Sequence, residues 1–82
     1  MTPFVVLWHP AHTEQLKSMG LRLAETICTA VHAAAENGSG DIRRARADHP
    51  NRIRIHVRGA VVFADVDAEA QTLTVLRILR TG

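Results

Sequence analysis

Residues 52–58 read Arg-Ile-Arg-Ile-His-Val-Arg, so that polar and apolar side chains alternate without interruption. Successive side chains of a β-strand point to opposite faces, whereas an amphipathic helix repeats about every 3.6 residues. The segment therefore predicts a strand whose Ile53, Ile55 and Val57 face a core. The opposite face is expected to carry a cationic row, with neighbours roughly 7 Å apart along the strand. The residues of this row are Arg52, Arg54, His56 and Arg58.

Residues 21–37 carry the clearest helical period in the chain. Apolar side chains recur there at spacings of three and four residues, which predicts a helix with one buried face. Gly38, in the turn sequence Asn-Gly-Ser-Gly, predicts the end of this helix. A shorter helix is expected over residues 11–19, because Pro10 suits the first position of a helix and Gly20 suits its cap.

The remaining segments are rich in strand-forming residues and are separated by turn residues. Residues 4–8, apolar on both faces, predict a strand that is covered on both sides or lies inside the sheet. Further strands are expected over residues 42–47, 52–57, 60–66 and 72–79, joined by turns at 48–51, 58–59 and 67–71. This order predicts an α+β fold, with two N-terminal helices packed on one face of a mainly antiparallel sheet. The sheet has four or five strands, depending on residues 42–47, and the chain is expected to be a single domain over residues 1–82.

Positive charge is concentrated in one part of the chain. The net charge is only +2, but residues 41–58 hold six arginines against two aspartates, a balance of +4. Such a segment favours a nucleic-acid or acidic-protein partner. The single cysteine, Cys28, excludes an intramolecular disulfide and predicts a reducing, cytoplasmic location. No apolar run reaches the length of a membrane span, so no membrane partner is expected.

Two histidines, His9 and His12, are close in the sequence but have no acidic or cysteine neighbour. Two ligands are too few for a metal site, so neither a metal nor another cofactor is expected. The glycines after residue 37 do not continue as a phosphate-binding loop. The cationic row is therefore the feature most able to support chemistry.

Three stretches of the chain have a pattern found together in one known family. They are residues 6–11 (Val-Leu-Trp-His-Pro-Ala), 51–63 (Asn-Arg-Ile-Arg-Ile-His-Val-Arg-Gly-Ala-Val-Val-Phe) and 73–80 (Leu-Thr-Val-Leu-Arg-Ile-Leu-Arg). With the order of elements, they resemble the RelE/ParE superfamily, the toxins of bacterial type II toxin–antitoxin systems, and favour its RelE-like branch. The resemblance implies a ribosome-dependent mRNA endonuclease that inhibits translation, needs no metal and uses the 2′-hydroxyl of the RNA as nucleophile. It also implies a cognate antitoxin that masks the basic surface.

The resemblance also implies roles for individual residues. Cleavage through a 2′-hydroxyl needs a base, cations around the phosphate and an acid for the leaving oxygen. His56 is the expected base or acid, because histidine titrates near neutral pH. The other residues expected in catalysis are Arg54, Arg58 and Arg80, and those expected to bind RNA are Arg43, Arg44, Arg46, Arg52 and Arg77. The chain departs from the family in having Ala60 where a catalytic arginine is expected, and in having no tyrosine.

Three alternatives stay open at the level of the sequence. A toxin similar to ParE would poison DNA gyrase without cutting RNA. A toxin-fold protein without catalytic activity would only bind its antitoxin. The cationic row can also be the plain solvated face of a sheet, since arginine stems cover such faces well. The expected partners are the antitoxin with the ribosome and mRNA, or alternatively gyrase, in a homodimer or a toxin–antitoxin hetero-oligomer.

Overall fold

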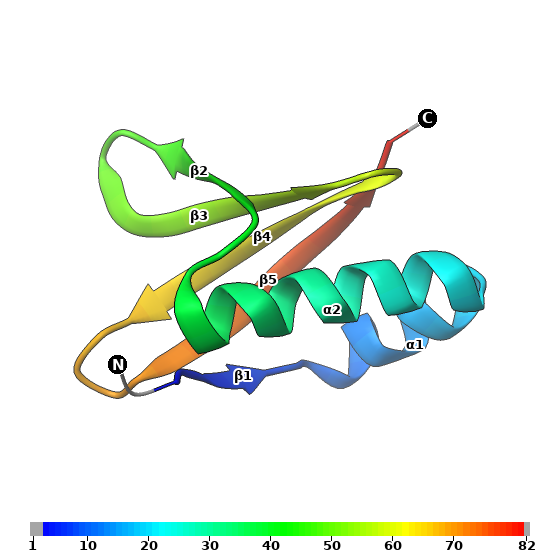
Figure 1. Cartoon of the computed structure of the whole chain (residues 1–82), viewed down its shortest axis with the longest axis horizontal. Coiled ribbons are helices and arrows are strands. Elements are labelled where there is room, and N and C mark those ends of the chain that lie inside the picture. Colours follow the sequence, from blue (N-terminus) through cyan, green and yellow to red (C-terminus); the bar gives the residue numbers. More distant parts are fainter. Residues whose placement is uncertain (1–2, 82) are drawn as a thin grey trace.

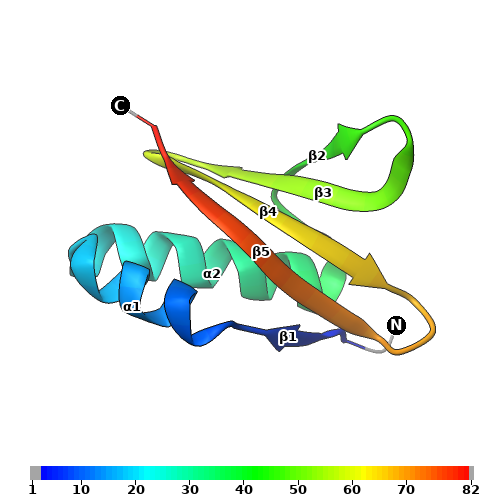
Figure 2. The ribbon, with the colours of Figure 1, turned by 180° about the vertical axis from the view of Figure 1, so that it is seen from behind.

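The computed structural model describes residues 3–81 and has two layers, a pair of helices and a five-stranded sheet. Both helices lie on the same side of the sheet (Figures 1 and 2). The opposite side, the outer face, is covered by no other element of residues 3–81. The elements in chain order are β1 (Val5–Leu7), α1 (Pro10–Ser18), α2 (Leu21–Asn37), β2 (Asp41–Arg46), β3 (His49–Val57), β4 (Ala60–Asp67) and β5 (Thr72–Arg80).

The strands are ordered β1-β5-β4-β3-β2 across the sheet. Strands β2 to β5 form an antiparallel meander, and β1 pairs in parallel with β5. This arrangement confirms the predicted α+β fold with a mainly antiparallel sheet, and the sheet has the larger of the two expected strand numbers. The alternation in β3 is confirmed as well. Ile55 is fully buried, and Ile53 and Val57 pack against the same core.

The expectation that residues 4–8 are covered on both sides, or lie inside the sheet, is wrong. β1 is an edge strand, and its Val5 and Leu7 are 60% and 45% exposed. Only the alternate residues Phe4, Val6 and Trp8 pack against the core. The two apolar faces of β1 are therefore not both buried, because in residues 3–81 the sheet has a helical layer on one side only.

The connection between β2 and β3 is shorter than the sequence indicates. Residues 48–51 predict a turn, but β3 already begins at His49 and the turn consists of Ala47 and Asp48. Pro50 lies within β3 even though it has no N–H to donate. The strand tolerates Pro50 because the pairing of β4 with β3 begins only at Arg52.

The helix ends follow from the residues that flank them. His9 caps α1, since its Nδ1 accepts a hydrogen bond from the backbone nitrogen of Ala11 at 3.0 Å. Gly38 ends α2 in the left-handed conformation with φ of 70°, and its nitrogen donates to the carbonyl of Ala34 at 3.0 Å. Helix α2 has the predicted bounds, and α1 begins and ends one residue earlier than predicted.

Helix α2 supplies the centre of the core. Its Ile27, Val31 and Ala35 are buried against the helix-facing side of the sheet. No polar or charged residue within residues 3–81 is buried, so the stability of the fold depends on apolar packing. The buried residues of the sheet are Ile55, Ala60, Val62, Ala64, Leu73, Val75 and Ile78.

A β-bulge in β5 changes which residues of this strand face outward. Phe63 pairs with Arg77, but the next residue of β4, Ala64, pairs with Val75, so Leu76 is an extra residue. Strict alternation from Leu73 and Val75 would direct Arg77 into the core. The bulge instead turns Ile78 inward, where it is buried, and leaves Arg77 on the outer face.

We expect Ile27→Ala to lower the free energy of unfolding by about 2–5 kcal/mol, because it leaves a cavity between α2 and the sheet. Leu21→Ala is a matched control in the same helix, at a side chain that is 76% exposed. This control should change the free energy of unfolding by less than about 0.5 kcal/mol. Urea unfolding followed by circular dichroism measures both variants, and equal losses would contradict the orientation of α2.

Candidate nucleic-acid interface

The strand register assembles a row of side chains across the outer face. Arg43 on β2 pairs with Arg54 on β3. Phe63 on β4 lies between Arg54 and Arg77 of β5 and pairs with both. Paired residues of antiparallel strands share a face, with Cβ atoms about 4.5–5.5 Å apart. This Arg–Phe row therefore places an aromatic ring between two guanidinium groups.

His56 lies two residues after Arg54 on the same face. Its cross-strand partners are Asp41 on β2 and Val61 on β4. Asp41 accepts hydrogen bonds from Nε and Nη2 of Arg43, at 3.0 and 3.1 Å. These hydrogen bonds lower the pKa of the Asp41 carboxyl, and the charge of Arg43 and the nearby imidazole of His56 act in the same direction. An ionised carboxylate is therefore held opposite the imidazole.

Two polar atoms of this surface, Nε of Arg54 and Nε2 of His56, are buried without a hydrogen-bond partner in the protein. Arg54 makes a long contact of 3.5 Å from Nη2 to the backbone oxygen of Arg44. A buried polar group without a partner costs about 1–3 kcal/mol, and more when it is charged. Because both atoms are enclosed by the protein, a ligand on the outer face contacts these two side chains through their other nitrogens.

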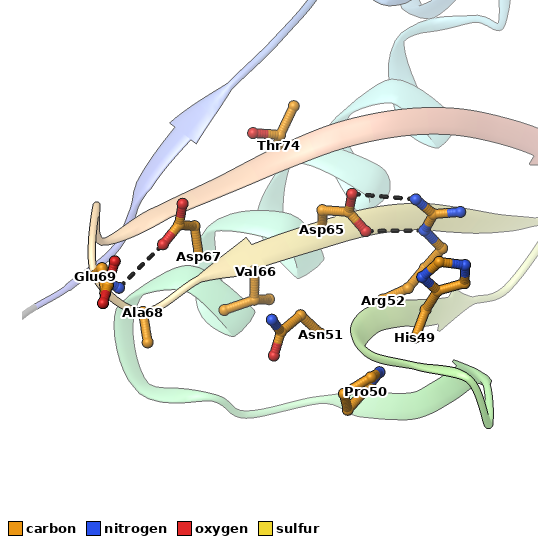
Figure 3. Close-up of a pocket in the computed structure, with 10 residues that line it drawn as sticks. All are labelled: His49, Pro50, Asn51, Arg52, Asp65, Val66, Asp67, Ala68, Glu69 and Thr74. Carbon is orange, nitrogen blue, oxygen red and sulfur yellow. Dashed lines mark hydrogen bonds and ion pairs between the residues drawn. The ribbon is translucent and has the colours of Figure 1, made fainter.

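Three other arginines of the basic segment are paired with carboxylates. Arg52 donates to Asp65 through Nε at 2.9 Å and Nη2 at 3.2 Å (Figure 3). The hydrogen bonds from Arg52 to Asp65 raise the pKa of its guanidinium. Arg43 pairs with Asp41 in the same bidentate way, and Arg46 pairs with Asp48 at 3.1 Å. The aspartates offset the charge of these arginines, which makes them weaker ligands for phosphate than the unpaired ones.

Arg54 and Arg77 are the arginines of the outer face that keep their charge uncompensated. Neither forms an ion pair with any residue of the described part of the chain. Arg44, which was also expected to bind RNA, is exposed but pairs with Ile53, whose side chain packs against the core. Arg44 therefore projects from the helix side of the edge strand β2.

The end of the sheet beyond Arg52 is acidic. A hollow there is lined by Arg52, by Asp65 and Asp67 of β4, and by Glu69 of the loop that follows β4 (Figure 3). Asp67 accepts hydrogen bonds from the backbone nitrogens of Glu69 and Ala70, at 3.0 and 3.1 Å. Carboxylates repel phosphate, so the surface suited to an anion runs from Arg54 toward Arg77 and away from this hollow.

Arg58 and Arg80 do not join the residues of the outer face. Arg58 lies beyond the end of β3, in the turn before β4, and lines a hollow with Arg80 and with Arg22 of α2. Arg80 pairs with Ala60, which is fully buried on the helix side. The expected row of four is therefore wrong at its last member, because the hairpin reverses the chain before Arg58 can continue the alternation.

The sequence alone does not indicate a role for two residues of the outer face, Phe63 and Asp41. Phe63 belongs to an apolar run in which no polar alternation marks the exposed side. Its pairing with Arg54 and Arg77 becomes visible only in the sheet. The sequence nevertheless contains an indication that Phe63 faces outward. The small residues Ala60 and Ala64 favour the inward face of β4, which leaves Phe63 on the outer face.

Exposed apolar side chains border the Arg–Phe row. Leu7 on β1 is 45% exposed, and Leu76 and Leu79 on β5 are 38% and 41% exposed. Leu79 pairs with Val61 and lies two residues from Arg77 on the same face. The outer face thus combines unpaired cations with apolar surface, a composition that suits a protein partner as well as an RNA base.

Residues 3–81 contain no group of three or more His, Cys, Asp or Glu side chains that is placed to hold a metal ion. His9 and His12 contact each other edge to face, with ring centroids 5.9 Å apart, and His9 uses its Nδ1 to cap α1. None of the helices in the described part of the chain is both long enough and apolar enough to cross a membrane.

Among solved structures, this fold is similar to a chain of the toxin–antitoxin complex RelBE2 from Mycobacterium tuberculosis, known from its crystal structure. The TM-score is 0.80 at 13% sequence identity, and the alignment covers 99% of this chain and 94% of that chain. No family model and no curated protein matches the sequence. At this identity the similarity establishes a shared fold, and it agrees with the RelE-type fold expected from the sequence.

We expect Arg52 and Asp65, whose side chains are 32% and 42% exposed, to show a small favourable coupling. The bidentate contact favours a coupling above that of most exposed ion pairs. A double-mutant cycle with Arg52→Ala and Asp65→Ala, measured by urea unfolding, gives the coupling. The coupling should shrink at about 1 M salt, where the screening length is about 3 Å. A coupling of zero at low salt would mean that Asp65 does not hold Arg52.

Proposed function

We propose that this protein is the toxin of a bacterial type II toxin–antitoxin pair, and that it cleaves ribosome-bound mRNA on the outer face of its sheet. The fold shared with a chain of the RelBE2 complex supports the toxin role. The observation that carries the RNA assignment is the strand register. It puts Arg54, His56 and Arg77 on one uncovered face, around Phe63.

In the proposed complex, one RNA base stacks on Phe63 and the adjoining phosphate lies between Arg54 and Arg77. Stacking on an aromatic side chain contributes about 1–3 kcal/mol per base and does not require a particular base. Guanidinium groups bind phosphate oxygens through two parallel N–H donors. Because neither arginine is held by a carboxylate of residues 3–81, both are free to bind in this way.

In the proposed reaction, the neutral imidazole of His56 removes the proton of the 2′-hydroxyl. The 2′-oxygen then attacks the adjacent phosphorus, and the bond from phosphorus to the 5′-oxygen breaks. The products are a 2′,3′-cyclic phosphate and a 5′-hydroxyl, whose proton comes from water. Arg54 and Arg77 stabilise the negative charge that develops on the phosphoryl oxygens. The carboxylate of Asp41, opposite His56, stabilises the positive charge that the imidazole gains.

The two other arginines expected in catalysis have no part in this centre. Arg58 and Arg80 line a hollow on the helix side of the molecule. Ala60, at the position where the family resemblance places an arginine, is fully buried and pairs with Arg80. The proposed centre therefore relies on Arg77, which the bulge in β5 leaves on the outer face.

The cognate antitoxin is proposed to cover this same face. Exposed Leu7 and Leu79 offer apolar anchor points beside the unpaired Arg54 and Arg77. An acidic, amphipathic segment complements both features, because its apolar side buries the leucines and its carboxylates meet the arginines. Such a segment would exclude RNA by occupying its site.

A gyrase poison, or an antitoxin-binding protein without catalytic activity, is the second candidate. No residue paired with His56 or Arg54 is a histidine, and His49 lies at the other end of β3, beside Arg52. No second imidazole is therefore near His56 to protonate the leaving oxygen. The mixture of cations and exposed leucines equally suits a protein target. These observations fit a binding protein as well as a nuclease and give the experiment a defined alternative.

We expect His56→Ala to slow mRNA cleavage in a purified translation reaction by about 10²- to 10⁴-fold, the usual contribution of general acid–base catalysis. Arg54→Ala should slow it by about 10²-fold, because a donor to the developing charge is lost. The matched control is His32→Ala, which removes an exposed histidine of α2 and should cut like the unaltered protein. Primer extension on the ribosome-bound message measures the cuts.

This reaction, together with a gyrase supercoiling assay and an antitoxin-binding assay, separates the alternatives. Unchanged cleavage by His56→Ala would remove His56 from the mechanism. Inhibited supercoiling by gyrase, with intact mRNA, would select the gyrase poison. Absence of both effects, together with tight binding of an antitoxin, would select the inactive binding protein.

A further inference from the structure

A second basic surface lies on the helix side of the molecule, where α2 begins. One hollow there is lined by Arg22 of α2, Arg58 of the β3–β4 turn and Arg80 at the end of β5. The β3–β4 turn, the end of β5 and the start of α2 all lie at the same end of the molecule (Figures 1 and 2). No carboxylate lines this arginine hollow, whose other lining residues are Met19, Gly20, Leu21, Leu23 and Thr26.

The arginines of the hollow have no carboxylate partner within residues 3–81, although Glu25 lines an adjoining hollow with Arg22 and Arg58. Among residues 3–81, no ion pair and no side-chain hydrogen bond is formed by the guanidinium of Arg22, Arg58 or Arg80. The paired arginines of β2 and β3 differ in this respect, since each has an aspartate partner. Like charges around one hollow repel each other, and an anion bound between them removes that cost.

The backbone holds the arginines in place. The nitrogen of Thr81 donates to the carbonyl of Gly59 at 2.9 Å, which ties the end of β5 to the turn that carries Arg58. Gly59 has φ of 97°, and a Cβ on it would lie 3.2 Å from Cδ1 of Leu23, so the turn packs closely on α2. These contacts fix the backbone positions of the arginines, and a ligand has only their side chains to order.

The start of α2 adds to the positive potential of the hollow. Gly20 provides no side-chain cap, and the first turn of this 17-residue helix has no acidic residue. No carboxylate of the first turn therefore offsets the partial positive charge of the helix end. The helix end only strengthens a site that the arginines already form.

We infer that the arginine hollow binds a phosphate group of single-stranded RNA. Convergent guanidinium groups without carboxylates match the shape and charge of phosphate. The choice of RNA rests on the proposed function, through the continuity of β5. Arg77 faces the outer face, and Arg80 lies three residues farther on, roughly 10 Å along the strand, on the side of the hollow. A strand of RNA bound on the outer face reaches the hollow by passing over the end of β5.

Fluorescence anisotropy of a labelled single-stranded RNA oligonucleotide, titrated at several KCl concentrations, tests this inference. Arg22→Ala should weaken binding about tenfold at low salt, the loss expected for one charge-assisted contact. It should also reduce the slope of log K against log salt by about 0.7, the share of one phosphate of a single strand. Arg58→Ala and Arg80→Ala should each weaken RNA binding and reduce the salt slope as Arg22→Ala does.

The control variant is Lys17→Ala, which removes one positive charge from the last turn of α1. Lys17 is paired with Glu14 at 3.2 Å and does not line the hollow. Lys17→Ala should therefore leave the salt slope of RNA binding unchanged. All four side chains are exposed, so none of the substitutions is expected to unfold the protein. Thermal unfolding of every variant checks that a loss of binding is not a loss of folding.

The outcomes separate this site from the outer face. The inference is overturned if the hollow variants bind like Lys17→Ala while Arg54→Ala binds weakly, and the proposed function then stands. Weak RNA binding by Arg22→Ala with normal RNA binding by Arg54→Ala would support the hollow as an RNA site and contradict the outer face as one. Unchanged RNA binding by Arg22→Ala would overturn the inference even if that variant lost binding of a poly-glutamate peptide or of inorganic phosphate. Lost binding of poly-glutamate would then indicate an acidic protein as the ligand of the hollow, and lost binding of inorganic phosphate would indicate free phosphate.

Discussion

The packing of α2 against the sheet is the contact on which both basic surfaces depend. Ile27 and Val31 of the helix, and Ile55 and Val62 of the sheet, are all fully buried. Because the strands alternate, burying one set of residues forces the other set onto the outer face. A slip of β3 by one residue would bury Arg54 and His56, which no core of this kind can accept without partners. The cationic face is therefore a consequence of where the apolar side chains are covered.

Charge compensation divides the arginines into two kinds. Aspartates hold the guanidinium groups of Arg43, Arg46 and Arg52, so these residues contribute less to the available positive potential than their number indicates. Apart from Arg44 at the edge strand, the uncompensated arginines lie on two surfaces, one on the outer face and one at the start of α2. A protein with a net charge of only +2 can in this way present strongly basic sites, because what matters for an anion is the local charge.

Local patterns were sufficient for much of the fold. The period of α2 and the glycine after it predicted both ends of that helix, since caps and periodicity depend on neighbouring residues. The alternation of β3 predicted correctly that Arg52, Arg54 and His56 lie opposite Ile53 and Ile55. The position of β1 could not be predicted in this way. Its apolar residues are compatible with an inner strand, and only the parallel pairing with β5 places it at the edge.

The sequence by itself determined the elements, the inward residues of α2 and β3, and the basic character of residues 41–58. The tertiary structure alone decided which arginines meet. Phe63 is brought between Arg54 and Arg77 by pairing across three strands, and Arg77 reaches that face only because Leu76 forms a bulge. Arg22, Arg58 and Arg80 converge although long stretches of chain separate Arg22 from the other two. The physical reason is that periodicity acts between neighbours in the chain, whereas register and charge pairing act between strands that meet only after the core has formed.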